Sequence, residues 1–291
     1  MLKLFENYKA DLNKGKVSIY LLNFKELDNP ILQRIGVLRA ETFGLVGAGT
    51  DKLIDIDEND LLYSHIVIVD EVDIIGSYRV AKMTAVMKDN KLASHVSNYY
   101  TLGDLFYEKA ESMMELGRSF IQKKYWSGNY LDYLWYGIGE FVNRNPTIDY
   151  LYGSVSVGNS YSLEAKTYIK TFVDKWYGEY DNLVTPIHEF ILSQEKYDSF
   201  QKELTSDEPR KDLKILKNKL IEMGLNVPPL LKKYLSITEE GGAKIKATAY
   251  EPTFKSSSFF LLLELNKLKE LYKERYFKKR FYQWEILILF S

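Results

Sequence analysis

The stretch MELGRSFIQ at residues 114–122 predicts a β-strand, and the segments that follow it decide the fold. A polar turn at residues 123–130 leads into apolar residues that recur at helical spacing. The apolar face of this predicted helix is formed by Leu131, Leu134, Trp135, Ile138 and Val142. A second strand is predicted at residues 150–157, YLYGSVSV. This strand–helix–strand order is typical of a sheet covered by helices.

A helix and a β-hairpin are predicted upstream of this unit. The helix begins after Asn29, whose side chain can cap its first turn, and Pro30 suits the first helical position. An acidic stretch occupies residues 51–60. The runs HIVIVD at 65–70 and IIGSYRV at 74–80 are three residues apart, which predicts two antiparallel strands joined by a short turn.

The downstream half predicts helices first and then two further strands. Ser162 can cap a helix, and the polar stretch at residues 189–223 predicts one or two exposed helices that end at Gly224. Strands are predicted at residues 244–250 and 259–265, and a short helix follows them.

These elements together predict an α/β (α+β) fold, in which helices flank both faces of a mixed, mostly antiparallel twisted sheet. A chain of 291 residues is long enough for one large domain. We assign residues 1–277 to that domain, with a helical insertion at about 189–223, and leave the tail at 278–291 unassigned.

Composition excludes several classes of function. The 39 lysine and arginine residues nearly balance 40 aspartate and glutamate residues, which argues against nucleic acid as a partner. The chain has no cysteine, so disulfides and thiolate sites are excluded. The histidines at 65, 95 and 188 lack the spacing of a metal site, and we expect no metal and no permanently bound cofactor.

Hydropathy predicts a cytoplasmic protein. The first thirteen residues are too charged for a signal peptide, and no apolar run approaches the roughly 18 residues of a membrane span. Peripheral contact with the inner membrane face stays open, because RKDLKILKNKL at residues 210–220 is basic and amphipathic. An ordinary solvated helix explains that segment equally well.

Seven residues with the right chemistry for a site are spread along the predicted elements: Arg39, Phe43, Asp57, Asp60, Arg79, Glu115 and Arg118. Each has a structural explanation when taken alone. Arg39 fits a solvated helix position, Asp57 and Asp60 fit an exposed loop, and Glu115 with Arg118 fits an ion pair. Their order along the chain is more informative than any one of them.

That order, together with the motifs ELGRSF, GSYR, RAETF, DIDEND and YLYGSVSV, resembles the acyl-ACP-dependent N-acyltransferases of the GNAT superfamily. Within it the pattern is most similar to the ornithine-lipid and glycine-lipid N-acyltransferases, often labelled hemolysin-like. The acyl-homoserine-lactone synthases are a more distant likeness. The resemblance runs from about Leu32 to Phe277.

The resemblance implies a sheet that splays between its fourth and fifth strands, here residues 114–122 and 150–157, with the donor's pantetheine arm in the gap. The turn after the fourth strand would face the donor phosphate, because a helix N-terminus offers free N–H groups and a positive dipole end. The implied donor-binding residues there are Lys123, Ser127, Gly128 and Asn129. This turn has a single glycine, which favours acyl-ACP over acyl-CoA as the donor.

The resemblance also implies roles for the seven residues. An amine attacks the donor thioester, and a base must take its proton. We expect Glu115 to orient or deprotonate the amine and Arg118 to assist it, with Arg39, Phe43, Asp57, Asp60 and Arg79 contacting substrate. In a dry cleft the pKa of Glu115 would be raised unless Arg118 lowers it. Because neighbours three apart in a regular strand face opposite ways, we predict a β-bulge near Gly117.

Three functions remain open at this point. The first is transfer of a long acyl chain, 3-hydroxylated chains included, from acyl carrier protein (ACP) to a small amino acid, which makes a lyso-aminolipid. The second is synthesis of an acyl-homoserine lactone or N-acyl amino acid signal. The third is a GNAT-like protein that binds acyl carriers or membranes without catalysis. The chain departs from the lipid branch at Tyr63-Ser64-His65, where Cys-Asp-His is usual, and at Glu251 and Ser258, near which that branch often has Asp.

Overall fold

The computed structural model describes residues 2–49, 52–252, 254–278 and 280–281. Its centre is one eight-stranded sheet in which β8 and β9 pair in parallel and all other neighbours pair antiparallel. In sheet order the strands are β1 (Leu12–Lys14), β2 (Val17–Asn23), β3 (Ser64–Val69), β4 (Ile74–Lys82), β8 (Met113–Ile121), β9 (Tyr150–Val157), β12 (Ser256–Glu264) and β11 (Ala243–Glu251). The predicted mixed, mostly antiparallel sheet is confirmed.

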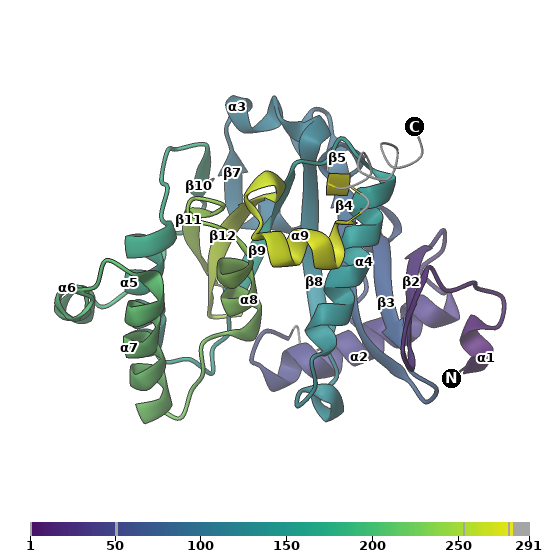
Figure 1. Cartoon of the computed structure of the whole chain (residues 1–291), viewed down its shortest axis with the longest axis horizontal. Helices are drawn as coiled ribbons and strands as arrows, with labels where there is room; N and C mark the ends of the chain where they lie inside the picture. The colour runs from purple at the N-terminus through teal and green to yellow at the C-terminus, as the bar shows by residue number, and fades with distance from the viewer. Residues whose placement is uncertain (1, 50–51, 253, 279, 282–291) are drawn as a thin grey trace.

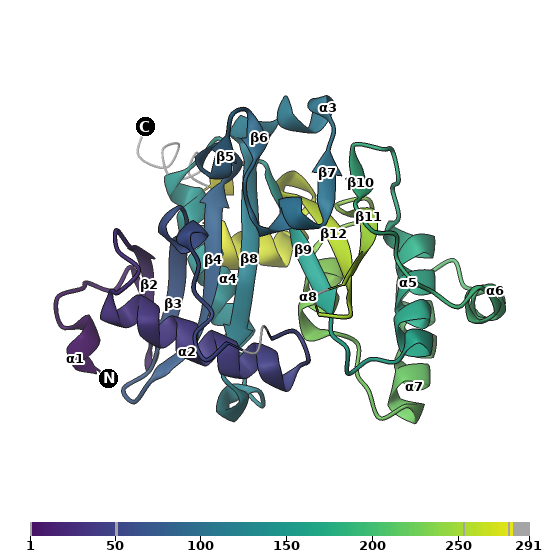
Figure 2. The same cartoon turned by 180° about the vertical axis from the view of Figure 1, so that it is seen from behind.

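Helices cover both faces of this sheet, as predicted (Figures 1 and 2). On one face α4 (Tyr130–Arg144) packs over β2, β3 and β4, next to α8 (Pro229–Ile237) and α9 (Glu270–Tyr276). On the other face α2 (Pro30–Leu45) packs against β4 and β8. The Asn29 side chain accepts hydrogen bonds from the first turn of α2, so the predicted cap is confirmed.

The polar stretch after β9 forms a group of helices at one side of the sheet. Ser162 caps α5 (Leu163–Tyr177), and α6 (Gln194–Glu203) and α7 (Pro209–Glu222) pack against α5. The predicted stop at Gly224 is confirmed, because this residue adopts a φ of 71°, which glycine tolerates best. The boundaries of a helical insertion and of one domain remain predictions.

Several short elements have no counterpart in the sequence prediction. They are α1 (Leu2–Phe5), α3 (Asp104–Tyr107), and two small sheets that pair β5 (Met87–Lys88) with β6 (Lys91–Leu92) and β7 (Tyr100–Leu102) with β10 (Val184–Pro186). Strand β1 and the seven-residue strand β2 of the main sheet were not predicted either. Strands of two or three residues carry too few positions for an alternating pattern to show. Most of the tail assigned to 278–291 lies outside the described residues.

The sheet splays between β8 and β9, as the resemblance implied. The two strands pair only over Met113–Glu115 and Tyr150–Tyr152. Beyond Glu115, the edge of β8 that faces β9 has no strand partner in the described chain. Unpaired backbone N–H and C=O groups on such an edge are available to a ligand.

Candidate active site

The Glu115 carboxyl lies at the point where β8 and β9 separate, and 1% of the residue's surface is exposed. The Tyr63 hydroxyl donates to Oε1 at 2.8 Å, and the Tyr152 hydroxyl donates to Oε2 at 3.1 Å. Burial raises the pKa of Glu115 although these hydrogen bonds and the nearby charge of Arg79 oppose the shift. A raised pKa brings a carboxylate base nearer to the pH at which it must work.

Open space lies beside this carboxyl, next to Gly117. A Cβ placed on Gly117 would meet one atom, Oε1 of Glu115, at 4.0 Å. By contrast, a Cβ on Gly153 of β9 would lie 2.3 Å from the carbonyl oxygen of Leu116, so the two strands touch there. The missing side chain at Gly117 therefore leaves room for a substrate atom beside Glu115.

A buried ionic network adjoins Glu115, centred on Asp60 in the one-turn 3₁₀ helix Glu58–Leu61. Arg39 of α2 donates two parallel hydrogen bonds to Asp60, at 2.9 and 2.8 Å. Arg79 of β4 lies 3.2 Å from both Asp57 and Asp60. The expectation that Arg39 is solvated is wrong, because it is 1% exposed, and Asp60 is fully buried rather than on a loop surface. The fork of a guanidinium matches a carboxylate, which explains why arginine occupies this position.

Asp60 is held ionised by this network, and His65 is held neutral chiefly by its burial. Burial alone would raise the pKa of Asp60, but the hydrogen bonds and charge of Arg39, with the charge of Arg79, hold it well below its usual range. Burial lowers the pKa of His65 from 6.5 to about 4. The His65 Nε2 lies 2.9 Å from the Asp60 carbonyl oxygen and donates to it, whereas the buried Nδ1 has no hydrogen-bond partner in the described chain, so His65 is a core histidine of which one ring nitrogen is satisfied.

The low pKa of His65 makes the fold sensitive to acid. As the pH falls below 6.5, the unfolded chain binds a proton at this residue and the folded chain does not. The contribution of His65 to the free energy of unfolding is therefore fully present above pH 6.5, and it is lost as the pH falls to about 4. Such a shift corresponds to about 3 kcal/mol. His65→Gln, which keeps a donor, should flatten the free energy of unfolding across this range in urea titrations. The exposed His188→Gln is the control, and an equal slope in the two variants would contradict the assignment.

Arg118 sits in the β-bulge that was predicted near Gly117. The register between β4 and β8 shifts after Ser77, and Arg118 has a φ of 52°, a left-handed conformation that is costly for a residue with a side chain. The bulge directs its guanidinium toward Asp55, at 3.3 Å, and toward the Phe43 ring, 5.7 Å away. The expected ion pair with Glu115 is therefore wrong. The Arg118 Nε is buried and has no hydrogen-bond partner in the described chain.

Sequence reasoning missed four residues of this site: Asp55, Tyr63, His95 and Tyr152. His95 lies in the 3₁₀ turn His95–Asn98, and its ring meets Tyr99 at 5.1 Å. Burial, with the positive charges of Arg118, Arg79 and Arg39, lowers the pKa of His95 well below its usual value, so the ring is neutral. The position of Tyr152 follows from pairing β8 with β9, but nothing local in the sequence marks Tyr63 or His95.

A second polar cluster continues along the same side of β9, where the strand has left β8. Ser156 and Ser256 donate to the buried Glu251, and Ser258 meets the hydroxyls of Ser154 and Tyr100. Burial raises the pKa of Glu251. Glu251 and Ser258 are positions at which the sequence departs from the lipid branch, so this polar cluster contains that departure.

The four implied donor-binding residues lie at the far end of β8. Lys123, Ser127, Gly128 and Asn129 are all exposed, and about six strand residues, or roughly 20 Å, separate them from Glu115. The Asn129 side chain does not cap α4, and no side chain in the described part of the structure accepts from the N–H groups of that first turn. The structure thus places this turn at the open end of the splay and keeps it apart from Glu115.

Two negative observations apply to the described residues. They contain no group of three or more histidine, aspartate or glutamate side chains placed to hold a metal ion. They also contain no helix with the length and apolar character needed to cross a membrane.

Comparison with known proteins identifies the family. A family model described as an acetyltransferase (GNAT) domain matches residues 38–136. A glycine N(alpha)-acyltransferase of Bacteroides thetaiotaomicron is 30% identical over 241 residues, covering 78% of this chain and 71% of that protein. One from Phocaeicola vulgatus is 29% identical over 249 residues, covering 78% and 73%. The solved CoA-dependent acyl-homoserine lactone synthase MesI is 11% identical, with a TM-score of 0.42 over 90% of this chain and 94% of that one. The chain belongs to the GNAT N-acyltransferases, in the family that contains the glycine N(alpha)-acyltransferases, and is an N-acyltransferase enzyme.

Proposed function

We propose that this enzyme transfers a long acyl chain, including 3-hydroxylated chains, from acyl-ACP or acyl-CoA to the amine of glycine or another small amino acid. The product would be a lyso-aminolipid. The observation that carries the proposal is the buried Glu115 carboxyl beside the open space at Gly117, at the apex of the splay. The glycine N(alpha)-acyltransferase relatives support glycine as the first acceptor to test.

The chemistry is a single displacement at the donor thioester. The amine nitrogen attacks the carbonyl carbon, the C–S bond breaks, and the carrier leaves as a thiolate that takes up the proton passed to Glu115, so that the released product is a thiol. Glu115 takes the proton that the amine loses, and the free backbone N–H groups of β8 stabilise the oxyanion. Tyr63 and Tyr152 hold the carboxylate in place, and burial raises the pKa of each hydroxyl far enough to keep it protonated.

Arg118 is suited to bind the carboxylate of the acceptor. Its guanidinium has one ion-pair partner, Asp55, which it shares with Arg39, and its buried Nε is unpaired in the described chain. A carboxylate bound there would neutralise a charge that stands close to two other guanidiniums, those of Arg39 and Arg79. Within the proposal, the acceptor lies on the same side of β8 as Glu115.

Arg118→Lys should raise the KM for the amino acid about 10–100-fold with a smaller change in kcat, because lysine cannot reproduce a forked contact with a carboxylate. Steady-state kinetics with glycine at saturating donor measure this split. Arg34→Lys is the matched control, since Arg34 is half-exposed and pairs with Asp73 away from Glu115. An unchanged KM for Arg118→Lys would remove the carboxylate contact.

The basic face of α7 supports an acidic partner for this enzyme. Arg210, Lys211, Lys214 and Lys217 are exposed on that helix, which packs against α5 through Leu216 and Leu220. The shared chemistry of ACP and an anionic lipid surface is a dense negative charge. Within the proposal, this face docks the donor's carrier or holds the enzyme at the inner membrane face.

The proposal is tested by incubating purified protein with acyl-ACP or acyl-CoA and a panel of amino acids, and by following thiol release. Mass spectrometry of lipid extracts from expressing and non-expressing cells identifies the product. An N-acyl amino acid with a long chain supports the proposal. A lactone product would instead indicate a signal synthase, and no transfer from either donor to any amino acid would contradict the proposed substrates.

A further inference from the structure

Amide formation from an amino acid removes two protons from one nitrogen. Near neutral pH the free acceptor carries an ammonium, so one proton must leave before the nitrogen can attack, and a second leaves once the new C–N bond forms. Glu115 passes one of them to the departing thiolate. The other proton has to reach water, and the reaction therefore needs a second proton acceptor beside Glu115.

A short turn next to Glu115 supplies a candidate for this acceptor. Ser94 precedes the 3₁₀ turn His95–Asn98, and its hydroxyl lies near enough to the Glu115 carboxyl and the Tyr63 hydroxyl to lower the pKa of both. His95 is the next residue along the chain, so its ring is held one position away from a neighbour of Glu115.

The ring nitrogens of His95 are available to a ligand. Neither forms a hydrogen bond within the described residues, and neither is fully enclosed, because the side chain is partly exposed. By contrast, the unpaired Nδ1 of His65 is fully enclosed, and its Nε2 is bound to the Asp60 carbonyl oxygen. A neutral imidazole offers one nitrogen as an acceptor, so His95 is suited to take a proton and to release it toward solvent.

The charges that act on His95 keep it ready for this task. They are all cationic and belong to Arg118 of β8, Arg79 of β4 and Arg39 of α2, and together with burial they keep the pKa of the ring well below its usual value. Within its own turn the ring meets Tyr99 at 5.1 Å, and burial raises the pKa of that hydroxyl to about 12. The same cations disfavour an ammonium bound among them, and they drive the proton off the imidazolium to water.

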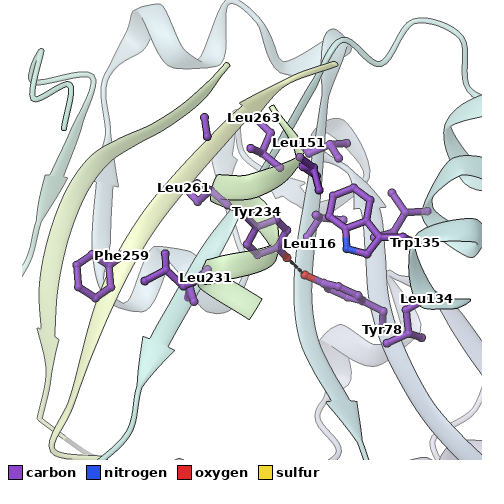
Figure 3. Close-up of a cluster of buried hydrophobic side chains, with 14 of the residues drawn as sticks. Tyr78, Leu116, Leu134, Trp135, Leu151, Leu231, Tyr234, Phe259, Leu261 and Leu263 are labelled. Carbon is purple, nitrogen blue, oxygen red and sulfur yellow. Dashed lines mark hydrogen bonds between the residues drawn. The ribbon is translucent and has the colours of Figure 1, made fainter. Parts of the chain in front are cut away.

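The opposite face of the sheet is closed by apolar side chains (Figure 3). Successive strand residues point to opposite faces, so Leu116 lies in the core with Trp135 and Tyr234 while Glu115 faces the polar site. The hydroxyls of Tyr78 and Tyr234 in that core bind each other. A proton that leaves the acceptor therefore reaches water on the side of the sheet where His95 lies.

We propose that His95 takes the first proton from the acceptor's ammonium and passes it to water, before Glu115 takes the second. This role rests on the proposed function, because it requires an amino acid whose carboxylate lies at Arg118. The N–H bond of the ammonium breaks, an N–H bond forms on the imidazole, and the amine keeps the electron pair with which it attacks the thioester. The imidazolium then returns to the neutral ring by giving its proton to water.

The test compares two acceptors that share a carboxylate but differ in the protonation of their nitrogen. Glycine carries an ammonium at neutral pH, whereas the aminooxy nitrogen of aminooxyacetate is unprotonated and has no first proton to lose. We expect His95→Gln to lower kcat/KM for glycine about 10²-fold, the lower end of what a positioned base contributes, and to leave kcat/KM for aminooxyacetate unchanged. Thiol release from the acyl donor measures both. Raising the pH, which supplies free glycine amine, should return the variant toward the wild-type rate.

Two further variants frame this comparison. Glu115→Gln should slow both acceptors, because each loses a proton during attack, and the exposed His188→Gln should slow neither. Should His95→Gln fail to fold, as judged by circular dichroism, His95→Asn carries the same comparison.

Equal losses with the two acceptors would overturn the role of His95, because a general disturbance of the site does not distinguish them. An unchanged rate with glycine would overturn it as well. Absence of transfer by the wild-type enzyme to these and all other amino acids would overturn the proposed function itself. Transfer by the wild type without an acceptor-dependent loss in His95→Gln overturns the role of His95 alone, so the two failures are distinguishable.

Discussion

Glu115→Gln is expected to lower kcat about 10²–10⁴-fold, the usual contribution of a general base. Glutamine has the shape of glutamate and can still accept the hydrogen bond from Tyr63, so the fold around β8 should survive. What it cannot do is take a proton from the attacking amine. Because the pKa of Glu115 is raised by burial, wild-type activity should rise with pH through that raised value, and the variant should lack this limb.

Thiol release with glycine across a pH series measures both expectations. Glu111→Gln is the matched control, because Glu111 lies four residues earlier, is largely exposed and forms an ion pair with Lys82. Circular dichroism and thermal melts of both variants separate lost chemistry from lost fold. Wild-type rates for Glu115→Gln would assign proton transfer to another group, for which the neutral His95 is the next residue to test.

The elements that the sequence predicts correctly are those whose signal is local. The strands predicted at residues 114–122 and 150–157 match the bounds of β8 and β9 to within one or two residues. Each of these segments contains enough β-forming residues for a strand to be recognised from the sequence. The cap at Asn29 and the stop at Gly224 depend on single residue types with a defined conformational role. Elements of two to four residues, such as β5 and β6, carry no such signal.

Pairings over long sequence distances explain what was missed in the site. Arg39 looks like a solvated helix residue until a chain segment 21 residues later brings Asp60 against it. Tyr78 and Tyr234 meet across 156 residues, and no local pattern marks either one. The expected Glu115–Arg118 ion pair is absent for a different reason. The bulge was predicted, but the partners that bind the two side chains were not: Tyr63 and Tyr152 bind Glu115, and Asp55 binds Arg118. The order of residues along the chain identified the family, and the contacts within the site required the fold.

Asp60→Asn is expected to lower the free energy of unfolding by about 3–5 kcal/mol, the usual cost of breaking a buried ion pair. The substitution keeps the volume and one acceptor oxygen but removes the charge that balances Arg39 and Arg79, each 1% exposed. Both cations would then remain buried, with Asp55, the half-exposed Asp57 and Glu115 as the acidic groups near them. Because the wild-type pKa of Asp60 is lowered, its stabilising contribution is present above the ordinary carboxyl pKa and is lost as pH falls.

Asp57→Asn provides the contrast within the same turn. Asp57 also contacts Arg79 at 3.2 Å, but its side chain is 40% exposed, and solvent screening limits such pairs to about 1 kcal/mol or less. In urea unfolding at neutral pH, the loss in the free energy of unfolding should therefore be several-fold larger for Asp60→Asn than for Asp57→Asn. Equal losses would mean that water reaches Asp60 as freely as Asp57. The guanidiniums would then not lie in a site from which water is excluded, and the proposed contact between Arg118 and the acceptor carboxylate would have no electrostatic basis.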